Sequence, residues 1–210
     1  MHQYDRPRQA LAIGLAALAG FTDAVGFLSA DGYFVSFMSG NTTRLGVNLA
    51  RTPQLAITPA LLLVGFVIGV AGGAVIAGRA GTRRKPAVLA LVTTLLFAAS
   101  ASRMMGAHTA MLAQLVMAMG ALNNTFQRGG EVAIGLTYMT GALVKLGQAI
   151  GAGLLGEKRN SWKAYLLLWS GLALGAVLGA LTFSHLASAT LWLAAGWAAL
   201  MTLAALRIPA

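Results

Sequence analysis

The sequence lacks cysteine altogether and has few charged residues, and both absences exclude classes of protein. Without a thiol, the 210-residue chain can form no disulfide and no cysteine-ligated zinc site. Only 10% of its residues are charged, whereas a soluble domain usually has about 25%. The ranges 55–78 and 164–183 contain no charged residue at all. Because about 20 apolar residues suffice for a helix to cross a bilayer, these runs predict an all-α integral membrane protein.

Acidic residues are especially scarce, with five Asp and Glu against fifteen Lys and Arg. In a soluble protein the resulting net charge of +10 would favour nucleic-acid binding. Here the basic residues gather in short connections, chiefly 79–86 and 157–163, and in the two tails, which is the positive-inside pattern. We therefore expect the lipid bilayer as a partner and no nucleic acid. We also expect a bacterial inner (cytoplasmic) membrane location, with both termini cytoplasmic.

The first apolar run follows Arg6 and Arg8, as the apolar core of a signal peptide would. We prefer a first transmembrane helix, because polar residues such as Asp23 and further membrane segments follow it.

Apolar runs and helix breakers predict the order of the membrane segments. We expect these near 10–29, 33–50, 57–78, 87–102, 109–127, 131–155, 162–183 and 189–206. If every segment crossed fully, the basic connection 79–86 would lie outside, against the positive-inside rule. The conflict disappears if the first two segments make one net crossing and the fifth and sixth do the same. The sequence thus predicts about six net crossings, with a broken or re-entrant helix in each pair.

An internal repeat relates the two interrupted pairs. The stretch 35–46 (VSFMSGNTTRLG) aligns with 136–147 (LTYMTGALVKLG) at an offset of 101 residues. At the same offset Asp23 aligns with Asn124. This alignment indicates that the chain, which forms a single domain, consists of two related halves.

We therefore expect a single membrane domain over 1–210, with repeat one at 10–102 and repeat two at 109–206. Because each half would make an odd number of net crossings, we expect the repeats to be inverted. Inverted repeats with interrupted helices recur in secondary transporters, whose site lies near the membrane midplane.

Glycines at every fourth position form matching rows in the two halves, at Gly65, Gly69 and Gly73 and at Gly171, Gly175 and Gly179. Such rows allow two helices to approach closely. They predict either the interface between the halves or a homodimer through these glycine-rich helix faces.

Ionisable residues inside apolar segments are functional candidates because their burial in a membrane is costly. Asp23 lies well inside the first apolar run and is a candidate proton carrier or cation ligand; the alternative is a structural ion pair with Arg44 or Lys145. Arg44 and Lys145 occupy matching positions, where they could neutralise a carboxylate or an anionic solute. Their alternative is to extend to the membrane surfaces, as long basic side chains do. Asp31 and Glu131 lie near segment ends, where an interfacial position is expected.

Small and polar residues mark the two predicted helix breaks. We assign the breaks to Ser39 and Gly40 in the first half and to Gly141 in the second. Polar side chains at such breaks either satisfy freed backbone groups or bind a solute. Together with Asp23, Arg44 and Lys145, the residues expected to line a path for a solute are Asn41, Thr42, Asn123, Asn124 and Thr140.

No motif for catalysis or metal binding is visible. The three histidines are scattered, and neither HExxH nor a serine-hydrolase elbow occurs. We therefore expect no enzyme activity, no catalytic residue, no cofactor and no metal site.

Two motifs resemble those of the YoaK family of bacterial membrane proteins. GFTDAVGFL at 20–28 and MSGNT at 38–42 carry the resemblance, and TYMTG at 137–141 also fits the family pattern. The resemblance extends over most of the chain and implies a membrane protein of about six helices with no settled activity. Ser39 stands where the family usually has Thr, and Asn123 stands where Gln is usual.

The leading interpretation is a small secondary transporter or channel for a small polar or anionic solute, with proton coupling through Asp23 as an added hypothesis. The alternative is a non-transporting module that assembles with other membrane proteins or binds lipid, and whose centre is dry. An intramembrane enzyme is a third interpretation, for which no catalytic pair was found.

Overall fold

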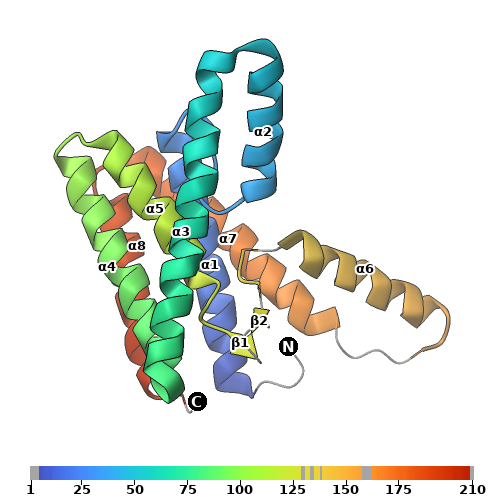
Figure 1. The fold of residues 1–210 in the computed structure, drawn as a ribbon. Helices are drawn as coiled ribbons and strands as arrows, with labels where there is room; N and C mark the ends of the chain where they lie inside the picture. Colours follow the sequence, from blue (N-terminus) through green and yellow to red (C-terminus); the bar gives the residue numbers. More distant parts are fainter. Residues whose placement is uncertain (1–4, 129–130, 133–134, 138, 158–161, 209–210) are drawn as a thin grey trace.

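The computed structural model describes residues 5–128, 131–132, 135–137, 139–157 and 162–208, and nearly all of them lie in helices (Figure 1). The α-helices are α1 (Arg6–Ser29), α2 (Met38–Arg51), α3 (Ile57–Ala80), α4 (Arg84–Met104), α5 (His108–Leu122), α6 (Met139–Leu154), α7 (Trp162–Leu186) and α8 (Thr190–Leu206). Short 3-10 turns, η1 (Pro53–Ala56) and η2 (Gly81–Arg83), flank α3. Strand β1 (Gln127–Arg128) pairs antiparallel with β2 (Glu131–Val132). The expected all-α class is confirmed.

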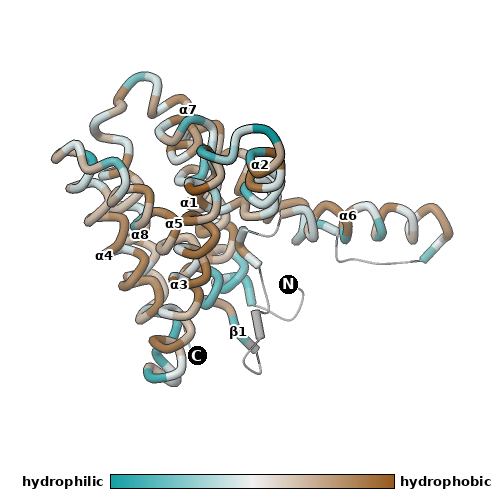
Figure 2. The backbone as a smooth tube through the Cα atoms, turned by 45° about the horizontal axis from the view of Figure 1, so that its top comes forward, coloured by the Kyte–Doolittle hydropathy of each residue, from teal (hydrophilic) through white to brown (hydrophobic). Residues whose placement is uncertain are grey.

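Among the described residues, three stretches are long and apolar enough to cross a membrane: Arg6–Ser29, Pro53–Met104 and Trp162–Leu186. The second contains both α3 and α4. Helices α5 and α8 are shorter and also apolar. Figure 2 shows apolar residues along the helices and hydrophilic ones mostly at helix ends and connections, as expected of a protein surrounded by lipid.

Helices α1 and α4 run in the same direction. At their starts, Lys85 lies within electrostatic reach of Arg8 and Asp5. At their other ends, Arg103 Nη1 donates a hydrogen bond to Ser29 Oγ at 3.0 Å. Because short connections reverse the chain on both sides of α4, α3 and α5 run opposite to α1.

Helix α7 runs parallel to α1, and α8 runs antiparallel to both α1 and α4. Successive glycines of α7 face successive residues of α1, with Gly171 against Ile13 and Gly179 against Phe21. On α8, Thr202 hydrogen-bonds Thr93 of α4 at 3.0 Å. Both described ends of the chain therefore lie at the same end of the helix bundle as η2 (Figure 1).

The two glycine rows form the interface between the halves. A Cβ at Gly69 would collide with the backbone carbonyl of Met117 in α5, and a Cβ at Gly175 with that of Ala17 in α1. Reciprocally, Gly120 faces the carbonyl of Phe66, and Gly20 faces that of Leu172. The structure therefore shows these rows at the interface between the two halves, which was one of their two expected uses.

The positions of these rows are covered within one chain, which leaves the expected homodimer through glycine-rich helix faces as a prediction. Their positions are occupied inside one chain by α1 and α5. Helix α6 carries other glycines, and Gly147 and Gly151 have nothing within 4 Å of a Cβ built on them.

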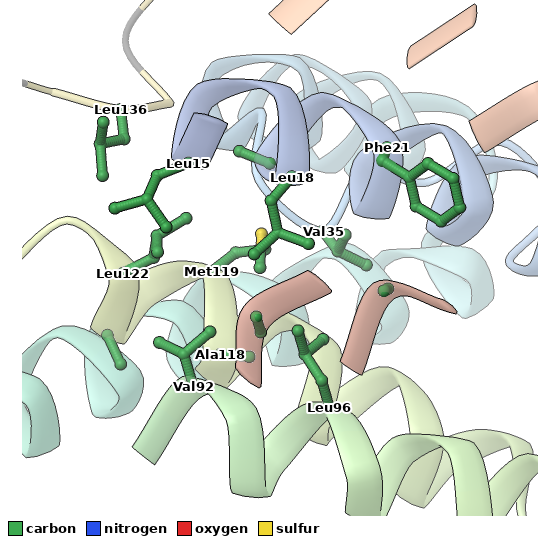
Figure 3. Close-up of a cluster of buried hydrophobic side chains, with 14 of the residues drawn as sticks. Leu15, Leu18, Phe21, Val35, Val92, Leu96, Ala118, Met119, Leu122 and Leu136 are labelled. Carbon is green, nitrogen blue, oxygen red and sulfur yellow. The ribbon is translucent and has the colours of Figure 1, made fainter. Parts of the chain in front are cut away.

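The core fills the space between α1, α4 and α5. Leu15 and Leu18 of α1 are fully buried and lie toward Leu96 of α4 and Met119 and Leu122 of α5 (Figure 3). This shared core holds α1 and α5, from which both interrupted segments begin, in a fixed position.

Three predicted boundaries differ from the structure. The segment expected at 33–50 is helical only from Met38, the one expected at 109–127 ends at Leu122, and the one expected at 131–155 becomes helical at Met139. The difference has one physical cause. In each half, non-helical chain precedes the short helix, and its apolar side chains resemble those of a helix in a hydropathy pattern.

The glycine contacts predict an asymmetric response to alanine within one helix. Gly69→Ala should lower the free energy of unfolding by about 1–3 kcal/mol, because the added methyl meets a backbone carbonyl. Gly72→Ala on the same helix is the matched control, because nothing lies within 4 Å of its Cβ position. Thermal unfolding in detergent, followed by tryptophan fluorescence, measures both; equal midpoints would contradict the packing.

Candidate functional site

In the first half, the chain folds back along α1 before α2 begins. A turn with positive φ at Asp31 (49°) and Gly32 (78°) reverses its direction, and the Gly32 amide donates to the Phe27 carbonyl at 3.0 Å. Asp tolerates this left-handed conformation better than most residues with a side chain. The chain then runs without helical structure to Phe37, so that residues 34–37 lie beside the interior of α1.

The carboxylate of Asp23 holds this returning segment in place. Its Oδ1 accepts hydrogen bonds from the backbone amides of Val35 at 2.8 Å and Ser36 at 2.7 Å. Gly26 leaves room for the approach, since a Cβ there would lie 2.6 Å from Val35 Cγ1. In the described parts of the chain, Asp23 forms no ion pair. The expected structural pairing of Asp23 with Arg44 or Lys145 is therefore not observed.

Asn41 clamps the same segment from the other side. Its Nδ2 donates to the Phe34 carbonyl at 2.7 Å, and its Oδ1 accepts from the Phe34 amide at 3.0 Å. The side chain is completely buried. Asn41 thus satisfies backbone groups that the broken helix leaves free, which was one of its two expected uses.

In the second half, Asn123 takes the place of Asp23. Its Nδ2 donates to Thr137 Oγ1 at 3.1 Å, and Ser36 and Thr137 are equivalent in the repeat. The interhelix packing fixes the register, because Gly20 and Gly120 make equivalent contacts to α7 and α3. Along these two helices the offset is 100, so the structural counterpart of Asp23 is Asn123 rather than Asn124.

Asn124 has a different role, linking α5 to α3 and to the bundle end. Its Nδ2 donates to the Val70 carbonyl at 2.9 Å, and its Oδ1 accepts from Gln127 Nε2 at 2.6 Å. Arg84 in turn donates to the Gln127 carbonyl at 2.9 Å. These bonds position the end of α5 against the other half.

A cavity of about 220 Å³ lies between the two breaks. Its lining comes from both repeats: Ser36, Phe37, Met38, Ser39, Phe66, Thr137, Met139, Thr140 and Gly141. Phe66 lies close to the middle of α3, which places the cavity at mid-depth in the bundle. Among the described residues no charged side chain is part of this lining, whose polar groups include hydroxyls from both halves.

Of the residues predicted at the site, Ser39, Thr140 and Gly141 line the cavity. Gly40 lies beneath two aromatic rings, with a Cβ there 2.5 Å from Phe37 Cδ1. Thr42 donates to the Met38 carbonyl at 2.9 Å and is not among the residues that line the cavity.

Arg44 and Lys145 do not meet at the cavity. The Arg44 guanidinium lies over the Tyr33 ring at 5.0 Å and donates to the Asp31 carbonyl at 3.5 Å. The Lys145 ammonium lies over the Tyr165 ring at 5.1 Å. Both stand further along α2 and α6, which diverge from their starts (Figure 1). The expectation that they neutralise Asp23 or a central solute is therefore wrong in this structure.

The other two acidic candidates lie toward the ends of their segments. Asp31 is exposed in the turn after α1, as expected for an interfacial residue. Glu131 belongs to β2, and its side chain lies outside the described part of the structure.

The lining residues that were not predicted from the sequence are Ser36, Phe37, Met38, Phe66, Thr137 and Met139. The repeat contained a signal for two of them, because Ser36 and Thr137 are hydroxyl residues at equivalent positions. Nothing in the pattern singled out Phe66, which belongs to a uniformly apolar helix and reaches the cavity through tertiary packing.

Comparisons with known proteins identify the family. The family model described as "Protein of unknown function (DUF1275)" matches residues 11–204. A transmembrane protein of Rhizobium meliloti, RA0705, is 38% identical over 95% of this chain and 87% of its own length. The transmembrane protein YoaK of Bacillus subtilis is 27% identical over 70% of this chain and 68% of its own length. No solved structure matches the chain. The resemblance to YoaK is thus confirmed, and the chain belongs to this family of transmembrane proteins of unknown function.

Proposed function

We propose that the chain is a small secondary transporter or channel and that a small polar or anionic solute occupies the cavity between the two breaks. The observation that carries the proposal is the lining of this cavity by equivalent residues of both halves. Ser39 and Thr140, which are matched in the repeat, both take part in it. A site at mid-depth between interrupted helices is the arrangement on which alternating access is built.

The proposed topology has two inverted repeats, about six net crossings and both termini in the cytoplasm of a bacterial inner membrane. Helix directions support the inversion, because α5 runs opposite to its counterpart α1. Basic residues support the orientation, since Arg8, Lys85 and Arg207 lie toward one end of the bundle. In this topology α2 and α6 are the second parts of the two interrupted pairs.

The chemistry of the lining favours a small solute that accepts hydrogen bonds. The starts of α2 and α6 contribute backbone amides and the positive ends of their helix dipoles. At the start of α2 the N-cap residue Phe37 makes no side-chain cap bond, so that side chain does not compete with a ligand for the first amides of the helix. A cavity of about 220 Å³ has room for several waters and therefore for a small solute.

A non-transporting membrane module is the second candidate, and the bracing contacts favour it. Asp23, Asn41 and Asn123 each hydrogen-bond the protein rather than pointing free into the cavity. In that case the two breaks would be rigid structure, with a dry space between them. Under both candidates we propose a role without catalysis.

Thiol labelling distinguishes the two candidates. Single cysteines at Ser39 and Thr140 should react with a hydrophilic, membrane-impermeant reagent in oriented vesicles, because both positions line the cavity. The matched control is Leu174→Cys on α7, a 63% exposed residue that should face lipid and stay unlabelled. Labelling of neither cavity position from either side, in folded protein, would favour the non-transporting module.

The clamp at the first break should be needed for stability. Asn41→Ala should lower the free energy of unfolding by about 2–3 kcal/mol, because it leaves both backbone groups of Phe34 without a partner. Thr42→Ala, next to it on α2, removes only an exposed hydroxyl and should change stability by less than about 0.5 kcal/mol. Unfolding in detergent measures both variants. If Asn41→Ala lowered the free energy of unfolding no more than Thr42→Ala does, the clamp would not be needed for stability.

A further inference from the structure

The two halves hold their returning segments with side chains of different charge. In the first half a carboxylate, Asp23, accepts from the amides of Val35 and Ser36. In the second half a neutral amide, Asn123, bonds to Thr137 at the equivalent position. Ser36 and Thr137 both line the cavity, so each brace positions one hydroxyl residue of its wall.

The second half does not contain the same brace, because Asn123 bonds the Thr137 hydroxyl and the Met119 carbonyl and, among the described residues, accepts from no backbone amide of the returning segment. An ionised carboxylate inside a membrane is costly, and proteins retain one there chiefly for function. Asp23 also has no ion-pair partner in the described chain that would offset this cost. The charge of Asp23 therefore needs a reason other than holding the returning segment before α2 in place.

The charged and titratable groups of the elements around Asp23 make other contacts or lie near helix ends. Arg44 of α2 lies over Tyr33, and Arg103 of α4 lies 4.9 Å from the Phe183 ring centroid and donates to Ser29. Helix α8 has no ionisable side chain, and α5 has only His108 at its first residue. Helix α7 has Lys163 and His185, one near each end.

We propose that Asp23 is a proton-binding site whose protonation releases the first returning segment and leaves the second one in place. The proposal rests on the transport function proposed above and adds which part of the site moves. Hydrogen bonds to a charged acceptor are roughly twice as strong as neutral ones. Protonation would thus weaken the bonds that Asp23 accepts from the Val35 and Ser36 amides, whereas the Asn123 brace contains no group that titrates.

Release of Val35 and Ser36 would loosen the wall of the cavity on one side only. Ser36, Phe37 and Ser39 belong to the released side, and Thr137 and Thr140 to the fixed side. A bound proton would thereby change access to the solute from the side of α2. The consequence is a one-sided gate in a protein whose two halves otherwise correspond.

The test compares cysteines at Ser39 and Thr140 as reporters of the two sides. In folded protein in vesicles, both cysteines are labelled with the same impermeant thiol reagent. The labelling rate at position 39 divided by the rate at position 140 is followed from about pH 8 to about pH 5. The ratio removes the effect of pH on thiol chemistry itself. We expect it to rise roughly tenfold on acidification, because two charge-assisted bonds are weakened together.

Asp23→Asn in both reporter proteins is the decisive variant, since it keeps the shape and the acceptor but cannot ionise. It should give a high ratio that no longer depends on pH. Asp23→Glu retains the acid and should keep a pH-dependent ratio, which guards against a general defect of the Asn variant. A thermal unfolding midpoint for each variant confirms that it is folded.

Three other results would overturn the proposal. A constant ratio with both cysteines labelled would leave the transport cavity intact but make Asp23 a fixed brace. A ratio that follows sodium at constant pH would assign a metal cation to Asp23 in place of the proton. Absence of labelling at both positions at every pH would reject the hydrated cavity and, with it, the gate.

Discussion

The structure depends on how backbone groups are satisfied where a helix is interrupted inside a membrane. No water is available in the hydrocarbon region, so each free amide and carbonyl needs a partner from the protein. Asp23 supplies two amides of the first returning segment with an acceptor, and Asn41 supplies both backbone groups of Phe34. Without these side chains the non-helical segment before α2 could not lie against α1.

These braces work only because the helices that carry them are held close together. Gly69 and Gly175 let α3 and α7 contact the backbones of α5 and α1 directly. The same contacts fix the register that places Asp23 and Asn123 at equivalent positions. The cavity thus forms because the two halves pack closely and because each half contains an interrupted helix.

The order of the helices was predictable from their apolar runs, whereas Ser39, Gly40 and Gly141, predicted as the breaks, lie in the first turns of α2 and α6, just after the non-helical chain. Ser39 and Thr140 were predicted at the site and do line the cavity, because matched polar residues in apolar surroundings are a local signal. Arg44 and Lys145 were misplaced, since a match in sequence does not reveal that α2 and α6 diverge and carry them away from the centre. The lining residue Phe66 could not be predicted, because only the docking of α3 brings it there.

The central claim is that the two breaks, about a hundred residues apart in sequence, face one another across a single cavity. Its most direct test is cross-linking of a double variant with cysteines at Ser39 and Thr140 by a short bifunctional thiol reagent. The account predicts rapid intramolecular cross-linking of this pair, and none between Ser39 and the exposed Leu154 at the far end of α6. Failure of the first pair to cross-link in folded protein, with both thiols reactive, would contradict it.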